Sequence, residues 1–308
     1  MITINDKQLL IDNVFSGGEL NIKLPELGLQ PFTPVVIDYR SKNPEDIFKL
    51  ALIVNAIRVN YDYFRPEIYL NIPYLPYARQ DRACHYGESF ALEVVMKFLH
   101  SLNISQISVL DIHSNIAKDI AKNNGMSEFN FVDFINTISY IRGIQDILDI
   151  SNLTVVAPDM GARNRVMRPI PDQIMSDYIE RDSELFGLLN KTKASIKKYN
   201  SIKKLVFEKE RTDNGIKQRL ILNEDTAFLN GKHALIVDDI CDGGATFTGL
   251  SKELYNLGAK SVSLFITHGI FRNGTDVLFD AGISNVITTN SLIQTITNHK
   301  GNFHVIKI

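Results

Sequence analysis

Short apolar runs alternate along this chain with longer segments in which apolar residues recur at helical spacing. The runs have the length and β-branched content of strands, and the longer segments have the period of amphipathic helices. The predicted strands lie at residues 35–37, 67–72, 107–110, 153–156, 204–207, 235–237 and 262–266. The predicted helices lie at 46–59, 89–101, 115–123, 175–190 and 246–257. Such alternation predicts an α/β fold of mostly parallel sheets flanked by helices.

The alternation falls into two similar halves. The first set of strands and helices ends near Ile147, and a new apolar run begins at Leu153. A chain of 308 residues also suits about two domains of ordinary size. We therefore expect one domain at residues 1–148 and a second at 149–308, the last segment being free to pack back on the first domain.

Composition excludes several classes of protein. Hydrophobic residues make up 44% and charged residues 22%, which argues against a disordered chain. A net charge of −2 gives no general attraction to nucleic acid, and no apolar run approaches the roughly 20 residues that cross a bilayer. The polar opening segment has no features of a secretory signal, and only Cys84 and Cys241 are present. We expect a protein of the reducing cytoplasm, without nucleic-acid or membrane partners.

The segment from Val237 to Thr246 has the most informative pattern. A wholly apolar run enters Asp238 and Asp239 and then a glycine-bearing turn before a predicted helix. In open α/β sheets ligands bind beyond the carboxyl ends of strands, and glycine turns at helix N-termini suit phosphate. An ordinary turn with capping aspartates is the structural alternative. The segment matches neither a Walker loop nor a dinucleotide fingerprint.

Three other predicted strands also end in polar clusters. These clusters lie at residues 77–82, 111–114 and 157–163. Taken singly, Arg79 fits a surface ion pair, His113 a hydrogen-bonded histidine, and Asp159 a helix cap. Because the carboxyl ends of parallel strands share one edge of a sheet, the clusters together predict a ligand site.

Six motifs, in this order, resemble the ribose-phosphate pyrophosphokinases, also called phosphoribosyl-diphosphate synthetases, across nearly the full length. The motifs are Phe15–Glu19, Pro73–Arg82 with its specific Tyr-Ala-Arg-Gln-Asp stretch, Asp111–His113, Pro158–Asp159, Lys209–Arg211 and Asp238–Thr246. The resemblance implies two phosphoribosyltransferase-type domains, with the site between them. It also implies transfer of the β,γ-diphosphoryl group of ATP to the anomeric hydroxyl of ribose 5-phosphate, releasing AMP.

The resemblance further implies roles for individual residues on the nucleotide side. ATP would be bound by Arg79, Gln80 and His113, with Phe15 and Glu19 contributed by a neighbouring subunit of a homo-oligomer, from dimer to hexamer. Magnesium would be held or oriented by His113 and Asp159.

On the acceptor side, the resemblance assigns Asp238 and Asp239 to the ribose hydroxyls. The 5-phosphate would be held by Asp242, Gly243, Gly244, Ala245 and Thr246. Lys209 and Arg211 would be catalytic cations on a mobile loop, since phosphoryl transfer depends on positioning and charge neutralisation.

Several positions depart from the family pattern. Gly243 replaces a hydroxyl-bearing residue, which removes a donor and is expected to leave room for a bulkier acceptor such as ADP-ribose, as in phage-type NAD salvage. We call Lys209–Arg211 the lid motif. Glu210 places a negative charge at its middle position, where the family has a positive one, and Gly17 stands where the family usually has an aspartate. Residues 83–89 replace a basic regulatory stretch, which predicts weak or absent activation by phosphate.

Two other functions fit part of the pattern. A phosphoribosyltransferase would share the acidic pair and the glycine turn, but it would not need Arg79 and Gln80 or the Lys209–Arg211 motif of the mobile loop. A non-catalytic regulatory subunit is disfavoured by the retained cations and by His113 and Asp159. Production of AMP from ATP plus a ribosyl acceptor separates these alternatives.

Overall fold

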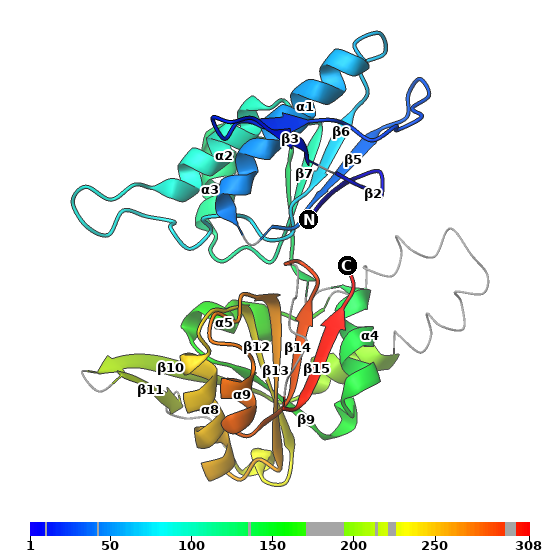
Figure 1. Ribbon diagram of the computed structural model, residues 1–308. Coiled ribbons are helices and arrows are strands. Elements are labelled where there is room, and N and C mark those ends of the chain that lie inside the picture. Colours follow the sequence, from blue (N-terminus) through cyan, green and yellow to red (C-terminus); the bar gives the residue numbers. More distant parts are fainter. Residues whose placement is uncertain are drawn as a thin grey trace. The chain divides into compact units, whose positions relative to one another are not determined.

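The protein forms two compact α/β units, as expected (Figure 1). The computed structural model describes residues 1–9, 11–41, 43–134, 137–170, 194–212, 215–220, 226–292 and 300–308. The first unit is mainly Met1–Val132, and the second is mainly Asp133–Asn290 with the C-terminal strand. Helix α4 (Ile138–Ile147) belongs to the second unit, although it precedes residue 149, where the sequence places the start of the second domain. That domain boundary stays a prediction.

The first unit is built on a six-stranded sheet in the order β2-β1-β5-β6-β7-β8. Strands β5 (Val35–Tyr39), β6 (Ile68–Asn71), β7 (Gln106–Leu110) and β8 (Phe129–Val132) are parallel. Strands β1 (Ile2–Ile4) and β2 (Lys7–Gln8) add an antiparallel edge, and β3 (Ile11–Val14) pairs with β4 (Leu20–Ile22) in a separate hairpin. The helices are α1 (Phe48–Asn60), α2 (Ala91–Ser101) and α3 (Ile116–Asn123).

The second unit is built on a seven-stranded sheet in the order β11-β10-β9-β12-β13-β14-β15. Its strands are β9 (Leu153–Ala157), β10 (Lys204–Thr212), β11 (Gly215–Leu220), β12 (His233–Cys241), β13 (Ser261–Gly269), β14 (Ile283–Thr289) and β15 (Asn302–Ile306). All neighbouring strands are parallel except β10 and β11. The helices are α5 (Met160–Met167), α8 (Ala245–Asn256) and α9 (Asp276–Asp280), besides α4. The helix predicted at 175–190 lies outside the described residues.

Helices cover both faces of the second sheet, and β13 shows how the sequence achieves this. Leu264 and Ile266 join the core that contains Leu250 of α8. The ring of Phe265, between them, packs edge-on against Tyr140 of α4 with centroids 4.8 Å apart. Because successive side chains of a strand point to opposite faces, α8 and α4 lie on opposite sides of the sheet (Figure 1). A strand buried on both faces explains the continuous apolar runs.

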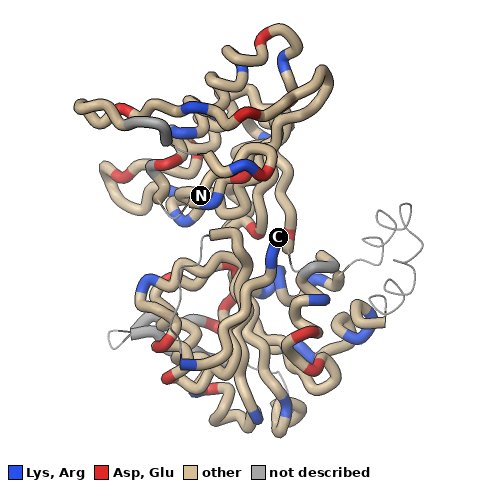
Figure 2. Tube along the Cα trace, turned by 45° about the vertical axis from the view of Figure 1, so that its right-hand side comes forward, with Lys and Arg blue, Asp and Glu red and all other residues tan. Residues whose placement is uncertain are grey.

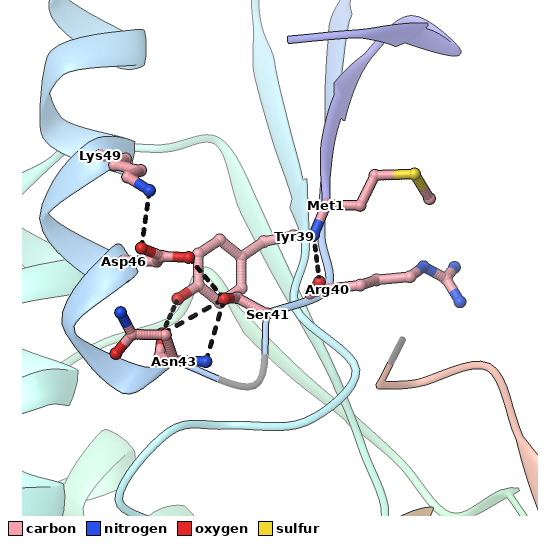
Figure 3. A network of polar contacts seen from close by, with 7 residues as sticks. All are labelled: Met1, Tyr39, Arg40, Ser41, Asn43, Asp46 and Lys49. Atoms are coloured by element: carbon pink, nitrogen blue, oxygen red, sulfur yellow. Dashed lines mark hydrogen bonds and ion pairs between the residues drawn. The ribbon is translucent and has the colours of Figure 1, made fainter. Parts of the chain in front are cut away.

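A polar network ties the end of β5 to the start of α1 (Figure 3). The Met1 ammonium donates to the Arg40 carbonyl at 2.6 Å, and Ser41 Oγ donates to Asp46 Oδ2 at 2.6 Å. Lys49 Nζ lies 2.7 Å from Asp46 Oδ1. Burial would raise the pKa of Asp46, but the hydrogen bonds from Lys49 and Ser41 lower it below its usual value. The carboxylate therefore stays ionised close to the helix N-terminus, where negative charge is favourable.

Positive and negative residues are interspersed along both units, in keeping with the small net charge (Figure 2). Among the described residues, no helix has both the length and the apolar character needed to cross a membrane.

Candidate functional site

The acidic pair of the acceptor motif lies inside β12, which is longer than the sequence predicts. The strand runs from His233 through the apolar segment and both aspartates to Cys241. The side chains of Asp238 and Asp239 are 14% and 6% exposed. Two nearly buried carboxylates side by side require compensating charge or hydrogen bonds.

Arg165 on α5 supplies that charge. Its Nη1 lies 3.1 Å from Asp238 Oδ1 and 3.6 Å from Asp239 Oδ1, and its side chain is only 13% exposed. The sequence pattern points to the cluster up to Arg163, which is exposed, and does not indicate Arg165. The only hint in the sequence is that a buried acidic pair needs a cation nearby. Many arginines of the chain could meet that need, so the sequence does not single out Arg165.

Asp159 adds a third carboxylate to this cluster. Burial raises the pKa of Asp238 well above its usual value, and the charges of Asp239 and Asp159 raise it further, whereas Arg165 lowers it. Asp159 also caps α5, because its Oδ1 accepts a hydrogen bond from the Ala162 amide at 3.1 Å. A carboxylate has two oxygens, so this cap leaves acceptor capacity for a ligand. The cluster carries more negative than positive charge, which favours hydroxyl donors or a divalent cation.

The glycine turn follows directly after the acidic pair. Gly244 is the N-cap of α8 with a φ of 86°, a conformation that favours glycine, and it provides no side-chain cap. The positive end of a helix dipole favours negative charge, so the start of α8 is a suitable place for an anion. The predicted strand–turn–helix arrangement at Asp242, Gly243, Ala245 and Thr246 is therefore present.

The space beside Gly243 differs from the expectation. A Cβ on Gly243 would lie 3.0 Å from Asn273 Nδ2 and 3.3 Å from Arg272 Nη2. The side-chain position that the glycine vacates is therefore lined by two other residues and is not open on that side. Local sequence does not indicate this contact, because Arg272 and Asn273 belong to the segment after the next strand.

The nucleotide-side residues lie in the first unit, after β6 and β7. Arg79 and Gln80 are exposed, and the backbone amide of Gln80 donates a hydrogen bond to the Tyr77 carbonyl at 2.9 Å. Asp81 is buried and lies 3.1 Å from Arg82 Nε. Burial would raise the pKa of Asp81, but Arg82, Ser114 and His113 lower it below its usual value. His113 is exposed, and because β6 and β7 are paired parallel strands, the segments that follow them lie at the same edge of the sheet.

The Phe15–Glu19 motif forms the turn of the β3–β4 hairpin. The Phe15 amide donates to the Glu19 carbonyl at 2.9 Å, and the Phe15 side chain is 53% exposed. A Cβ on Gly17 would lie 2.5 Å from Glu19 Oε2. In this conformation the Glu19 carboxylate therefore occupies the space of a side chain at position 17.

The lid motif lies in a β-hairpin. Lys209 and Arg211 belong to β10 and pair with Gln218 and Ile216 of β11, where a loop was expected. Their side chains lie outside the described structure, and their catalytic roles stay predictions. Within the described ranges no group of three His, Cys, Asp or Glu residues could by itself hold a metal ion. The metal roles of His113 and Asp159 also stay predictions.

Comparison with known proteins shows what the chain is similar to. No family model matches the chain. The ribose-phosphate pyrophosphokinase of Sulfolobus acidocaldarius is 27% identical over 282 residues, which cover 91% of this chain and 84% of that protein. The same-named protein of Pyrococcus abyssi is 26% identical over 286 residues, covering 90% and 82%. The crystal structure of phosphoribosylpyrophosphate synthetase from Mycobacterium smegmatis matches with a TM-score of 0.68 at 20% identity, covering 98% of this chain and 86% of that one, and supports the same fold. Over about nine-tenths of its length the chain is therefore similar to proteins named ribose-phosphate pyrophosphokinase, and its fold matches that of a phosphoribosylpyrophosphate synthetase.

Proposed function

We propose that the protein transfers the β,γ-diphosphoryl group of ATP to the anomeric hydroxyl of ribose 5-phosphate, giving phosphoribosyl diphosphate and AMP. The observation that carries this proposal is the acidic pair of β12, which is held by Arg165 and leads directly into the glycine turn of α8. The similarity to proteins named ribose-phosphate pyrophosphokinase over about nine-tenths of the chain supports it.

In the proposed acceptor site, the carboxylates of Asp238 and Asp239 accept hydrogen bonds from the vicinal ribose hydroxyls. Arg165 fixes their orientation through contacts of 3.1 and 3.6 Å. The 5-phosphate binds the amides of residues 242–246, where the positive end of the helix dipole favours it. One carboxyl pair and one anion site, a few residues apart in sequence, match the two ends of ribose 5-phosphate.

In the proposed nucleotide site, Arg79 and His113 contact the phosphates of ATP and Gln80 contributes a polar contact. Phe15 and Glu19 of a neighbouring subunit enclose the adenine, which requires a homo-oligomer. The exposed ring of Phe15 supports this role, because an aromatic face that is free of the core can stack on a base.

Magnesium fits the acidic cluster of the second unit. Mg²⁺ is usually held by one or two carboxylates together with substrate phosphates and water, so a cage of three protein ligands is not required. Asp159 offers an oxygen ligand of the preferred kind near the ribose, and His113 would orient a second, nucleotide-bound ion. The bound metal would neutralise negative charge on the transferring phosphates.

The reaction requires no covalent protein nucleophile. The anomeric oxygen attacks the β-phosphorus, the bond between that phosphorus and the bridging oxygen of AMP breaks, and the hydroxyl proton is released. Lys209 and Arg211 would stabilise the charge that develops on the transferring group. Both residues belong to the β10–β11 hairpin, a segment separate from the acidic pair and from the glycine turn.

ADP-ribose is a second candidate acceptor, which would place the reaction in NAD salvage. Its 5-phosphate is esterified and carries a further phosphate, so an additional cation near the glycine turn would favour it. Arg272, whose side chain is 71% exposed, lies beside Asp242 in that position.

One assay tests both candidates. The protein is incubated with ATP and magnesium plus ribose 5-phosphate or ADP-ribose in separate reactions, with ATP alone as the control. We expect AMP and a diphosphorylated product with one of the acceptors. AMP no higher than in the control with either acceptor would exclude the proposed activity.

A further inference from the structure

A second segment of the chain lies along the glycine turn. After β13, residues 270–273 fold back against residues 241–243, and we call them the β13 strap. The amides of Ile270 and Phe271 donate to the Cys241 carbonyl at 2.9 and 3.0 Å. The Arg272 amide donates to the Asp242 carbonyl at 3.0 Å. The strap therefore runs beside the turn, and its amides donate to carbonyl oxygens of residues 241 and 242.

The side chains at the end of the strap reach the turn itself. Asn273 Nδ2 donates to the Gly243 carbonyl at 3.1 Å, and Arg272 Nε lies 3.5 Å from Asp242 Oδ1. Two donor groups thus stand at 3.0 and 3.3 Å from the place where a side chain at position 243 would begin. Position 243 is where the family pattern has a hydroxyl donor.

We infer that Arg272 and Asn273 replace that missing donor and determine specificity for the acceptor by contacting its 5′-phosphoryl group. The inference rests on the proposed function, since it concerns the acceptor site of that reaction. Arg272 provides a guanidinium, which binds phosphate oxygens through several N–H groups and offsets the charge of Asp242. Asn273 has a second amide hydrogen besides the one directed at Gly243. A side chain at position 243 would press on both groups, and they would have to shift to accommodate it.

A bracing role for the strap is the alternative. If Arg272 served only to hold the turn, its removal would lower thermal stability and leave acceptor binding unchanged. The ion pair with Asp242 is largely exposed, at 71% and 29%, and exposed pairs contribute little to stability. Acceptor kinetics and thermal stability therefore separate the two roles.

The first experiment compares Arg272→Ala, Arg272→Lys and the wild type by steady-state kinetics, with ribose 5-phosphate and ADP-ribose as separate acceptors. Loss of one charge-assisted hydrogen bond predicts a rise of about 10- to 100-fold in the acceptor KM. We expect an unchanged ATP KM, an unchanged Tm and partial recovery in the lysine variant. If the KM rises for only one of the two acceptors, that acceptor is the one whose 5′-phosphoryl group Arg272 contacts.

Lys300→Ala is the matched control, because Lys300 forms another exposed ion pair of the second unit, 2.9 Å from Asp280. Its acceptor KM should equal that of the wild type. An acceptor KM in Arg272→Ala that also equals the wild-type value with both acceptors would overturn the inference. A wild type that forms no AMP with any acceptor would instead refute the proposed function.

A second experiment tests the exchange of donors directly. Gly243→Ser alone should raise the acceptor KM because it displaces Asn273. In an Asn273→Ala background the new hydroxyl has room, so Gly243→Ser should lower the acceptor KM relative to Asn273→Ala. If the effects of Gly243→Ser and Asn273→Ala on the acceptor KM simply add, the serine hydroxyl and the Asn273 amide do not compete for the same space, and the inference is contradicted.

Discussion

Arg165→Ala should destabilise the second unit strongly, and the effect should depend on pH. The substitution removes the guanidinium that lies 3.1 and 3.6 Å from two carboxylates. The three side chains are 13%, 14% and 6% exposed, so water replaces the lost charge only in part. The neighbouring charge of Asp159 increases the penalty.

The magnitude follows from this burial. Removing one partner of a buried ion pair costs about 3–5 kcal/mol, and the lower end applies here because these groups retain some exposure and a carboxyl can take up a proton. We therefore expect a loss of about 3 kcal/mol at pH 7.5. For a unit of this size that corresponds to a fall in Tm of about 6–12 °C.

The sign of the pH dependence follows from Asp238. Its pKa in the folded protein is already raised above the unfolded value, so its favourable contribution is present at low pH and is lost as pH rises through the folded pKa. Without Arg165 that pKa rises further. The difference in Tm between variant and wild type should therefore be smaller at pH 5.5 than at pH 7.5.

Thermal unfolding of both proteins at the two pH values is the assay, with Arg163→Ala as the control. Arg163 lies on the same helix but is exposed, so its loss should change the Tm by little. Arg165→Lys should recover part of the stability at both pH values. An Arg165→Ala variant that behaves like Arg163→Ala, or that loses the same Tm at both pH values, would refute the role of Arg165 as the cation of the acidic pair.

Four further outcomes are expected. Lys209→Ala should abolish most AMP formation while leaving ATP affinity and Tm close to wild type; near-normal turnover would remove Lys209 from the mechanism. Gly244→Ala should cost about 1–2 kcal/mol in thermal or urea unfolding, because its φ of 86° disfavours a Cβ, and an unchanged stability would contradict the geometry. A thiol reagent at pH 8 should label exposed Cys84 but not buried Cys241, whose pKa burial raises to about 12, and mass spectrometry of two labelled sites would disprove this. Because residues 83–89 lack the family's basic stretch, free phosphate should activate turnover weakly or not at all, and a strong phosphate requirement would refute this prediction.

Much of the fold could be predicted from the chain alone. The central parallel strands are continuous apolar runs because they are buried on both faces, and β9 has all five residues buried. Strand β14, which the sequence pattern does not predict, lacks such a continuous apolar run. In β14 the last two residues, Thr288 and Thr289, are polar and buried, and Thr289 Oγ1 is satisfied by the Thr267 carbonyl at 2.7 Å. A buried threonine cannot be told from an exposed one by local sequence.

The sequence by itself determined the fold class, the order of the family motifs and the place of the glycine turn after the acidic pair. These features are local, because a strand, its terminal aspartates and the following helix are contiguous in the chain. Only the tertiary structure decided which cation holds the acidic pair, since Arg165 and Asp238 are 73 residues apart. It also decided what fills the space beside Gly243, where Asn273 arrives from 30 residues away. Parallel strands place their carboxyl ends together in space but not in sequence, so the partners of each motif become known only when the sheet is assembled.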